Sequence, residues 1–228
     1  MAELLCRQVA PLDLGGLPLY VVPQSVIQAD FGNAETTYGY TLNWLDLILQ
    51  QQLGTVWRGR GPCIVANDIA MTEDLGGDIE ATFLATVLHE LGHVFERNMR
   101  FEAAPDASAA RMQFEGLRLA QAMSEPVPEN ERVKTYHQHD HRFIRAMLHL
   151  RYRALRTGVR LADEILFHNG PVAYIAPFEY SLALQNEPER LFEANIRSIL
   201  ASPIPPAFSR LWAEELEFLT RHSQKEMK

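Results

Sequence analysis

The amino-acid sequence predicts an α+β fold in which a small mixed sheet lies beside one long helix, with additional helices toward the C-terminus. Three observations lead to this prediction. Two short runs, at 17–22 and 63–70, contain the β-branched and aromatic residues that strands favour. Apolar residues recur at helical spacing from Asp78 to about Asn98, which indicates a long amphipathic helix. The same spacing returns in later segments of the chain.

The N-terminal elements follow from local patterns. The run LPLYVV at 17–22 is bounded by glycine and proline, and we expect the first strand there. Apolar residues at helical spacing over 37–53, with Gly54 as a stop, predict a helix. The run CIVANDIA at 63–70 predicts a second strand, and its asparagine and aspartate favour the edge of the sheet. Asp78 is a natural N-cap for the long helix that follows.

Beyond the long helix the composition changes. Alanine, proline, serine and glutamate dominate from about 101 to 131, around a short helical candidate at 111–123, and we interpret this stretch as a surface insertion. Helical spacing then predicts three more helices, at about 141–157, at about 188–200 with Asn186 or Glu187 near its cap, and at about 207–222.

The overall composition indicates one folded unit. The 228 residues are 47% hydrophobic and 22% charged, which is ordinary for a folded domain. We therefore expect a single domain over 1–228, with the insertion at about 101–131 and a helical C-terminal part from about 160. The two cysteines, Cys6 and Cys63, form no CxxC pair, which excludes a disulfide framework and a cysteine-based zinc ribbon.

Charge and hydropathy limit the expected partners. A formal net charge of -8 argues against a protein that coats nucleic acid, because a polyanion is repelled over most of such a surface. No segment is apolar for long enough to cross a bilayer, and the N-terminus lacks a basic start followed by an apolar stretch. We therefore expect a cytoplasmic protein without a membrane partner, and the sequence does not indicate an oligomeric state.

The long predicted helix carries the motif HELGH, an HExxH pattern made by His89, Glu90 and His93. Two histidines four positions apart project from one helical face, so both imidazoles can bind one ion. Glu90 lies about 100° further around the helix, where it could act as the general base on a water activated by zinc. Gly92, inside the motif, disfavours a helix unless another element must approach closely.

A catalytic zinc site needs a third protein ligand, and the sequence offers two kinds of candidate. The extended motif HExxHxxGxxH is excluded, because Glu96 and Met99 occupy its glycine and final histidine positions. A glutamate ligand from a following helix would be Glu115 or Glu102. The other candidates are three histidines within five residues, directly before the second core helix: His137, His139 and His141.

The histidine-rich segment YHQHDHRF contains the pattern HDxxF, from His139 to Phe143. Together with HELGH, it resembles the SprT-like metalloproteases, whose HExxH helix is followed by a histidine in an HGxxF pattern at the start of the next helix. The resemblance covers about 63–155 and implies a zincin-like fold that binds Zn²⁺. It further implies that His139 is the third ligand and that Phe143 packs in the core. His141, two residues away, is the main rival for the ligand role, because a loop can present either ring. Asp140 replaces the glycine of the pattern, and no cysteine-rich ribbon follows.

Motif and resemblance together lead us to expect a zinc metallopeptidase that acts on a protein or peptide substrate, for which the strand at 63–70 could offer an exposed edge. Its metal ligands would be His89, His93 and His139, and its general base Glu90. One alternative is a non-catalytic zinc-stabilised interaction module, and another is a helical protein in which HELGH is accidental. The basic residues of 132–160 could contact phosphates, but such a stripe is commonly a solvated helix face, so nucleic acid is not the partner we expect.

Overall fold

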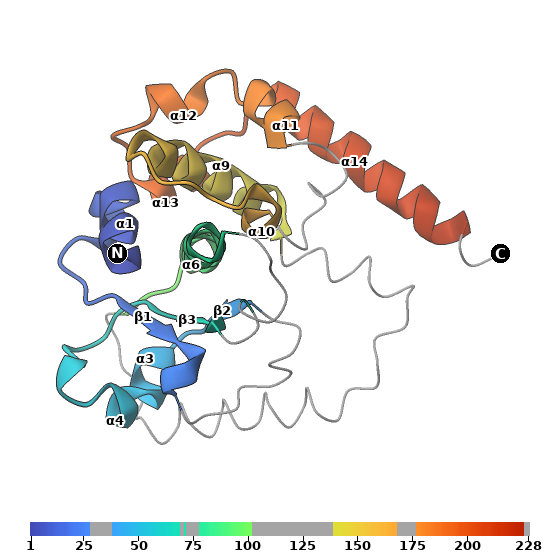
Figure 1. Ribbon diagram of the computed structural model, residues 1–228. Coiled ribbons are helices and arrows are strands. Elements are labelled where there is room, and N and C mark those ends of the chain that lie inside the picture. The colour runs from blue at the N-terminus through green and yellow to red at the C-terminus, as the bar shows by residue number, and fades with distance from the viewer. Residues whose placement is uncertain (28–37, 69–70, 72–77, 102–138, 168–176, 226–228) are drawn as a thin grey trace.

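The structure is a computed structural model, which describes residues 1–27, 38–68, 71, 78–101, 139–167 and 177–225. It confirms an α+β fold, in which a small mixed sheet packs against one long helix and further helices follow (Figure 1). The strands are β1 (Tyr20–Pro23), β2 (Gly39–Thr41) and β3 (Cys63–Ala66). The helices are α1 (Ala2–Val9), α2 (Pro11–Leu14), α3 (Leu45–Ile48), α4 (Gln50–Leu53), α6 (Ile79–Glu96), α9 (His141–Arg156), α10 (Asp163–Leu166), α11 (Pro177–Ala183), α12 (Glu187–Arg190), α13 (Ile196–Ala201) and α14 (Pro206–Lys225), with 3-10 turns η1 (Gln24–Val26) and η2 (Gly54–Val56).

The three strands lie in the order β1-β3-β2. β1 runs parallel to β3 and β2 runs antiparallel to it, and every residue of β3 is buried. The prediction that the strand near residue 63 lies at an edge was therefore wrong. The polar residues that suggested an edge, Asn67 and Asp68, come after the strand has ended. There the Asn67 N–H donates to the Tyr38 carbonyl, and Asp68 accepts hydrogen bonds from Ser25.

The sheet separates two groups of helices. Ile64 and Ala66 of β3 face the main core, whereas Cys63 and Val65 face a smaller cluster that includes Leu45 and other residues of the α3–α4 region. In Figure 1 the α3–α4 region accordingly lies on one side of the sheet and α6 on the other.

The helix predicted at 37–53 was wrong in its first half. The apolar spacing counted Tyr40, which lies in strand β2, and the chain then turns at Trp44, whose φ is 67°. Only two short helices, α3 and α4, follow this turn. Because Trp44 has a left-handed backbone conformation, the helix cannot continue from α3 back into the residues of β2.

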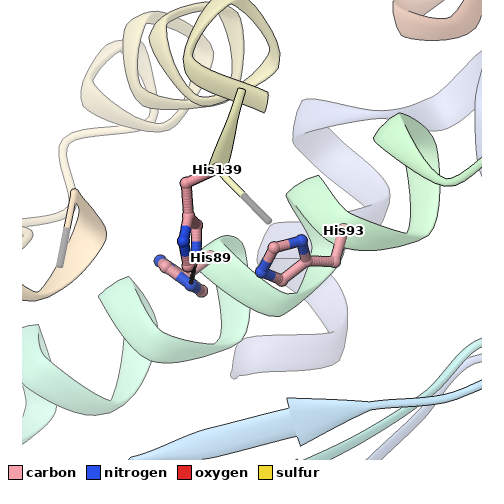
Figure 2. Close-up of side chains that lie close together, drawn as sticks. All are labelled: His89, His93 and His139. Carbon is pink, nitrogen blue, oxygen red and sulfur yellow. Dashed lines mark hydrogen bonds between the residues drawn. The ribbon is translucent and has the colours of Figure 1, made fainter. Parts of the chain in front are cut away.

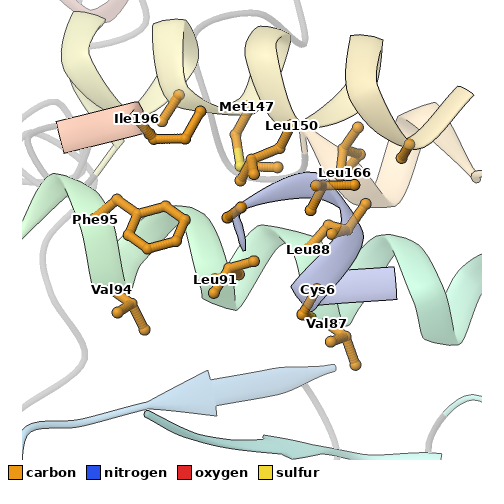
Figure 3. Close-up of a cluster of buried hydrophobic side chains, with 14 of the residues drawn as sticks. Cys6, Val87, Leu88, Leu91, Val94, Phe95, Met147, Leu150, Leu166 and Ile196 are labelled. Atoms are coloured by element: carbon orange, nitrogen blue, oxygen red, sulfur yellow. The ribbon is translucent and has the colours of Figure 1, made fainter. Parts of the chain in front are cut away.

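The long helix was predicted correctly. α6 begins after Asp78, whose side chain accepts a hydrogen bond from the Ala81 N–H at 3.1 Å, and it ends at Glu96. α6 is buried on nearly every side, because it lies between the sheet and α9 (Figure 1). Figure 3 shows Leu88, Leu91 and Phe95 of α6 within this core, with residues of α9 above them.

α9 was also predicted correctly, and it packs directly on the metal-motif helix. The Asp140 side chain caps it by accepting hydrogen bonds from the backbone N–H groups of Arg142 and Phe143. A Cβ atom on Gly92 of α6 would lie 2.4 Å from Sδ of Met147 and 3.1 Å from Cε2 of Phe143. Gly92 is therefore the point of close approach between the two helices, which explains a glycine inside the motif.

The C-terminal part is more broken than predicted. The single helix expected at 188–200 is two helices, because Asn195 starts α13 by capping the Ser198 N–H. The helix expected at 207–222 is α14, which is longer at both ends. The insertion predicted at about 101–131 lies outside the described residues except for Phe101, which is buried. No helix in the described part of the chain is both long and apolar enough to span a membrane.

Candidate metal centre

Three histidines from two parts of the chain converge between α6 and α9. His89 and His93 lie one turn apart on α6, and His139 lies just before α9 (Figure 2). One ring nitrogen of each lies within 4.8 Å of the others, and Nε2 of His89 is 3.1 Å from Nε2 of His139. This is the grouping of ring nitrogens that the motif and the resemblance predicted.

Phe143 supports all three imidazoles from the first turn of α9. Its ring centroid lies 4.9 Å from that of His89, 4.4 Å from that of His93 and 4.7 Å from that of His139. The Phe143 side chain is only 1% exposed, which confirms that it packs in the core. Because Asp140 caps α9 between His139 and Phe143, the same local sequence fixes the histidine and its apolar support.

His141, the one rival ligand among the described residues, does not join this cluster. The ring of His141 instead lies 6.0 Å from that of Trp212 on α14. The remaining candidates, Glu102, Glu115 and His137, fall outside the described residues. Within the described chain, these three histidines are the one group of three or more His, Cys, Asp or Glu side chains that could hold an ion.

The environment keeps the site in the form that binds metals. Burial, together with the neighbouring His89, Arg97 and His139, lowers the pKa of His93 well below its usual range, so its ring is neutral. Nδ1 of His89 lies 3.0 Å from the Leu166 carbonyl oxygen, which can only accept, so Nδ1 carries the hydrogen. Nε2 of His89 therefore presents its lone pair to the cluster, as a metal ligand must.

The donor set fits zinc. Zn–N bonds of about 2.0–2.1 Å at tetrahedral angles place neighbouring ligand nitrogens about 3.3–3.4 Å apart. The His89 and His139 nitrogens, 3.1 Å apart, are already close to this spacing, and all three nitrogens lie within 4.8 Å of one another. Three imidazoles would leave a fourth position for water or substrate, as in catalytic zinc sites.

Glu90 follows His89 and lies against the sheet. Its side chain is 6% exposed, and a Cβ atom on Gly39 of β2 would lie 3.2 Å from its Cγ. Burial raises the pKa of Glu90 to about 8, although the positive charge of Arg97 and a hydrogen bond from the Thr41 backbone oppose the shift. Glu90 is not part of the ligand group.

Two contacts of the site were not predicted. The Leu166 carbonyl, at the end of α10, is 77 positions from His89, and a backbone oxygen at that separation leaves no signal in the sequence. Oε2 of Glu96 lies 3.7 Å from Nδ1 of His93. The spacing of three between His93 and Glu96 places both on one helical face, and this signal could have been used.

The arginines of α9 are largely engaged within the protein. Arg145 makes a bidentate pair with Glu187, Arg151 pairs with Asp163, and Arg153 donates to backbone carbonyls. These side chains are directed to internal partners, which leaves fewer of them for phosphates than the sequence suggested.

The fold and the cluster together define an α+β chain with a buried three-histidine centre that could bind a metal ion. Comparison with protein-family models, with curated proteins and with solved structures finds no match. The resemblance to SprT-like metalloproteases therefore rests on the motif residues of the sequence alone.

Proposed function

We propose that this chain is a zinc-dependent peptidase that uses Glu90 as its general base. The observation that carries the proposal is the convergence of three imidazole nitrogens next to a buried glutamate on the same helix. A purely structural metal site has no need of that glutamate, whereas hydrolysis needs a proton acceptor beside the ion.

The roles of the residues follow from their positions. Zinc held by His89, His93 and His139 would supply Lewis acidity, lowering the pKa of a coordinated water and polarising the substrate carbonyl. Glu90 would accept a proton from the attacking water and return it to the nitrogen of the leaving amine. Its pKa of about 8 without a cation would fall when a dication lies nearby, so the carboxylate would be ionised near neutral pH.

The sheet supports an extended peptide as the substrate. Among the described strands, β2 pairs only with β3; on its other side the Thr41 backbone already hydrogen-bonds the side chains of Glu90 and Arg97, which leaves Gly39 as the edge position next to α6. Gly39 of β2 lies against Glu90, so a strand added beside β2 would run close to the proposed base. Main-chain hydrogen bonds at such an edge recognise peptides with little dependence on sequence.

The test compares wild type with Glu90→Gln after zinc loading. Both should bind one zinc, and Glu90→Gln should cleave unfolded casein about 10²–10⁴-fold more slowly, because it cannot accept the proton. Glu80→Gln is the matched control, since Glu80 is an exposed glutamate on the first turn of the same helix. Equal cleavage by Glu90→Gln and wild type would remove Glu90 from the mechanism.

A second candidate is a non-catalytic, zinc-stabilised interaction module. The observation that favours it is the burial of two of the three ligands, since His93 is 5% and His139 8% exposed, whereas His89 is half-buried. A structural zinc would contribute to the folding free energy directly. Wild type that binds zinc, melts at a higher temperature with it and cleaves no unfolded protein or peptide would support this module over the peptidase.

A further inference from the structure

The outer nitrogen of a metal-binding histidine normally donates a hydrogen bond, which fixes the tautomer and orients the ring. His89 has such a partner in the Leu166 carbonyl, 3.0 Å from its Nδ1. Nδ1 of His93 is buried and has no hydrogen-bond partner among the described residues. A buried donor left unpaired is costly, so a functional reason for it must be sought nearby.

A complementary atom that also lacks a hydrogen bond faces it. Oε2 of Glu96 lies 3.7 Å from Nδ1 of His93, and it too is buried and has no hydrogen-bond partner in the described chain. Nε of Arg97 is 3.8 Å from the same oxygen, which is an ion-pair distance and not a hydrogen bond. Two buried and complementary atoms therefore face each other just beyond hydrogen-bonding distance.

We propose that Glu96 is a positioning residue of the metal centre, whose carboxylate accepts the Nδ1 hydrogen of His93 when zinc binds the other ring nitrogen. This role presupposes the proposed metal site, because Glu96 would hold a ligand and not the ion. Metal binding at Nε2 requires a lone pair there, so the single hydrogen of the neutral ring must lie on Nδ1. That hydrogen then faces Glu96.

Only a small adjustment completes the contact. His93 and Glu96 lie three positions apart on α6, so the helix backbone already holds them on one face. An N–H···O hydrogen bond needs 2.7–3.2 Å between the heavy atoms, about 0.5–1 Å less than the present separation. Because the same ring carries the hydrogen at Nδ1 and the lone pair at Nε2, the orientation of the His93 ring and metal binding are coupled.

The experiment measures zinc affinity by competition with a chelator. Glu96→Leu, which has no acceptor, should weaken zinc binding about 10–100-fold. Glu96→Gln should stay within about threefold of wild type, because its amide carbonyl can accept the same hydrogen. Glu80→Leu, on the exposed first turn of α6, is the matched control and should bind zinc as wild type does. Glu96→Ala replaces Glu96→Leu if the larger apolar side chain prevents folding.

A second readout reports the hydrogen bond itself. Nitrogen-15 NMR of the zinc-loaded protein should show a slowly exchanging Nδ1 hydrogen on His93 in wild type and Glu96→Gln, and should lose it in Glu96→Leu. Unchanged zinc affinity in Glu96→Leu, or equal weakening in both Glu96 variants, would overturn the role of Glu96 alone. Wild type that binds no zinc would instead refute the metal centre on which this role depends.

Discussion

Replacing Gly92 with alanine should disturb both the core and the metal site. The added Cβ would lie 2.4 Å from Sδ of Met147, a distance at which one of the atoms must move. It would also lie 3.1 Å from Cε2 of Phe143, whose ring contacts all three histidines. Met147 is flexible, but both side chains are at most 1% exposed, so the space for relief is small.

The magnitude follows from two opposing effects. Overpacking of a close-packed core costs about 1–3 kcal/mol, and alanine in place of glycine inside a helix returns about 0.8–1 kcal/mol. We therefore expect Gly92→Ala to lower the free energy of unfolding by up to about 2 kcal/mol, which corresponds to a fall in Tm of up to roughly 8 °C for a chain of this size. Zinc affinity should fall as well, because a displaced Phe143 ring displaces the imidazoles that it supports.

Urea denaturation of the metal-free protein and chelator competition together test this expectation. Gly16→Ala is the matched control, because a Cβ there would meet nothing within 4 Å, and its stability should stay within about 0.5 kcal/mol of wild type. If Gly92→Ala were as stable as wild type and bound zinc as tightly, the close contact between α6 and α9 could not be what requires glycine.

Three further predictions concern the ligands, the base and the buried ion pair. Elemental analysis should find no bound zinc in His139→Ala and one zinc in His141→Ala; loss only in the second would exchange the two roles. In the metal-free protein, the raised pKa of Glu90 means that its stabilising contribution is complete below about pH 4.5 and declines toward pH 8, at about 1.4 kcal/mol per pH unit. The free energy of unfolding of Glu90→Gln relative to wild type should therefore increase over that range, and a difference independent of pH would contradict the shift. Glu187→Leu leaves the buried Arg145 guanidinium without its carboxylate, so the free energy of unfolding measured by denaturant titration should fall by about 3–5 kcal/mol. A fall below about 1 kcal/mol would show that the pair contributes little.

The helices that could be predicted from the sequence were those with a capping residue or a regular apolar spacing. Asp78 caps α6 through its own side chain, and the apolar spacing of α9 was clear over four turns, so short-range patterns were enough. Helical spacing failed at Tyr40, because a three-residue strand is too short to show alternation and its place is set by pairing with β3. The split between α12 and α13 depends on a single cap at Asn195 within an otherwise helical pattern.

Part of the candidate site could likewise be predicted from local sequence patterns, and part could not. His89 and His93 follow from helical geometry alone, whereas choosing His139 over His141 required the family pattern. The folded chain separates these two by their relation to the Asp140 cap: His139 precedes the helix and faces α6, and His141 begins it and approaches Trp212. The Leu166 carbonyl depends on tertiary contact between α10 and α6, which no local pattern encodes.

Through the proposed zinc site, the enclosed position of α6 would link metal supply to the lifetime of the folded chain. Amides of a helix covered by a sheet on one side and a helix on the other exchange with solvent only when the whole domain opens. An ion bound to such a helix stabilises it against that opening by about 2.7 kcal/mol when free zinc exceeds Kd a hundredfold. Hydrogen exchange in α6 should then slow by about two orders of magnitude, and resistance to proteolysis should rise with it.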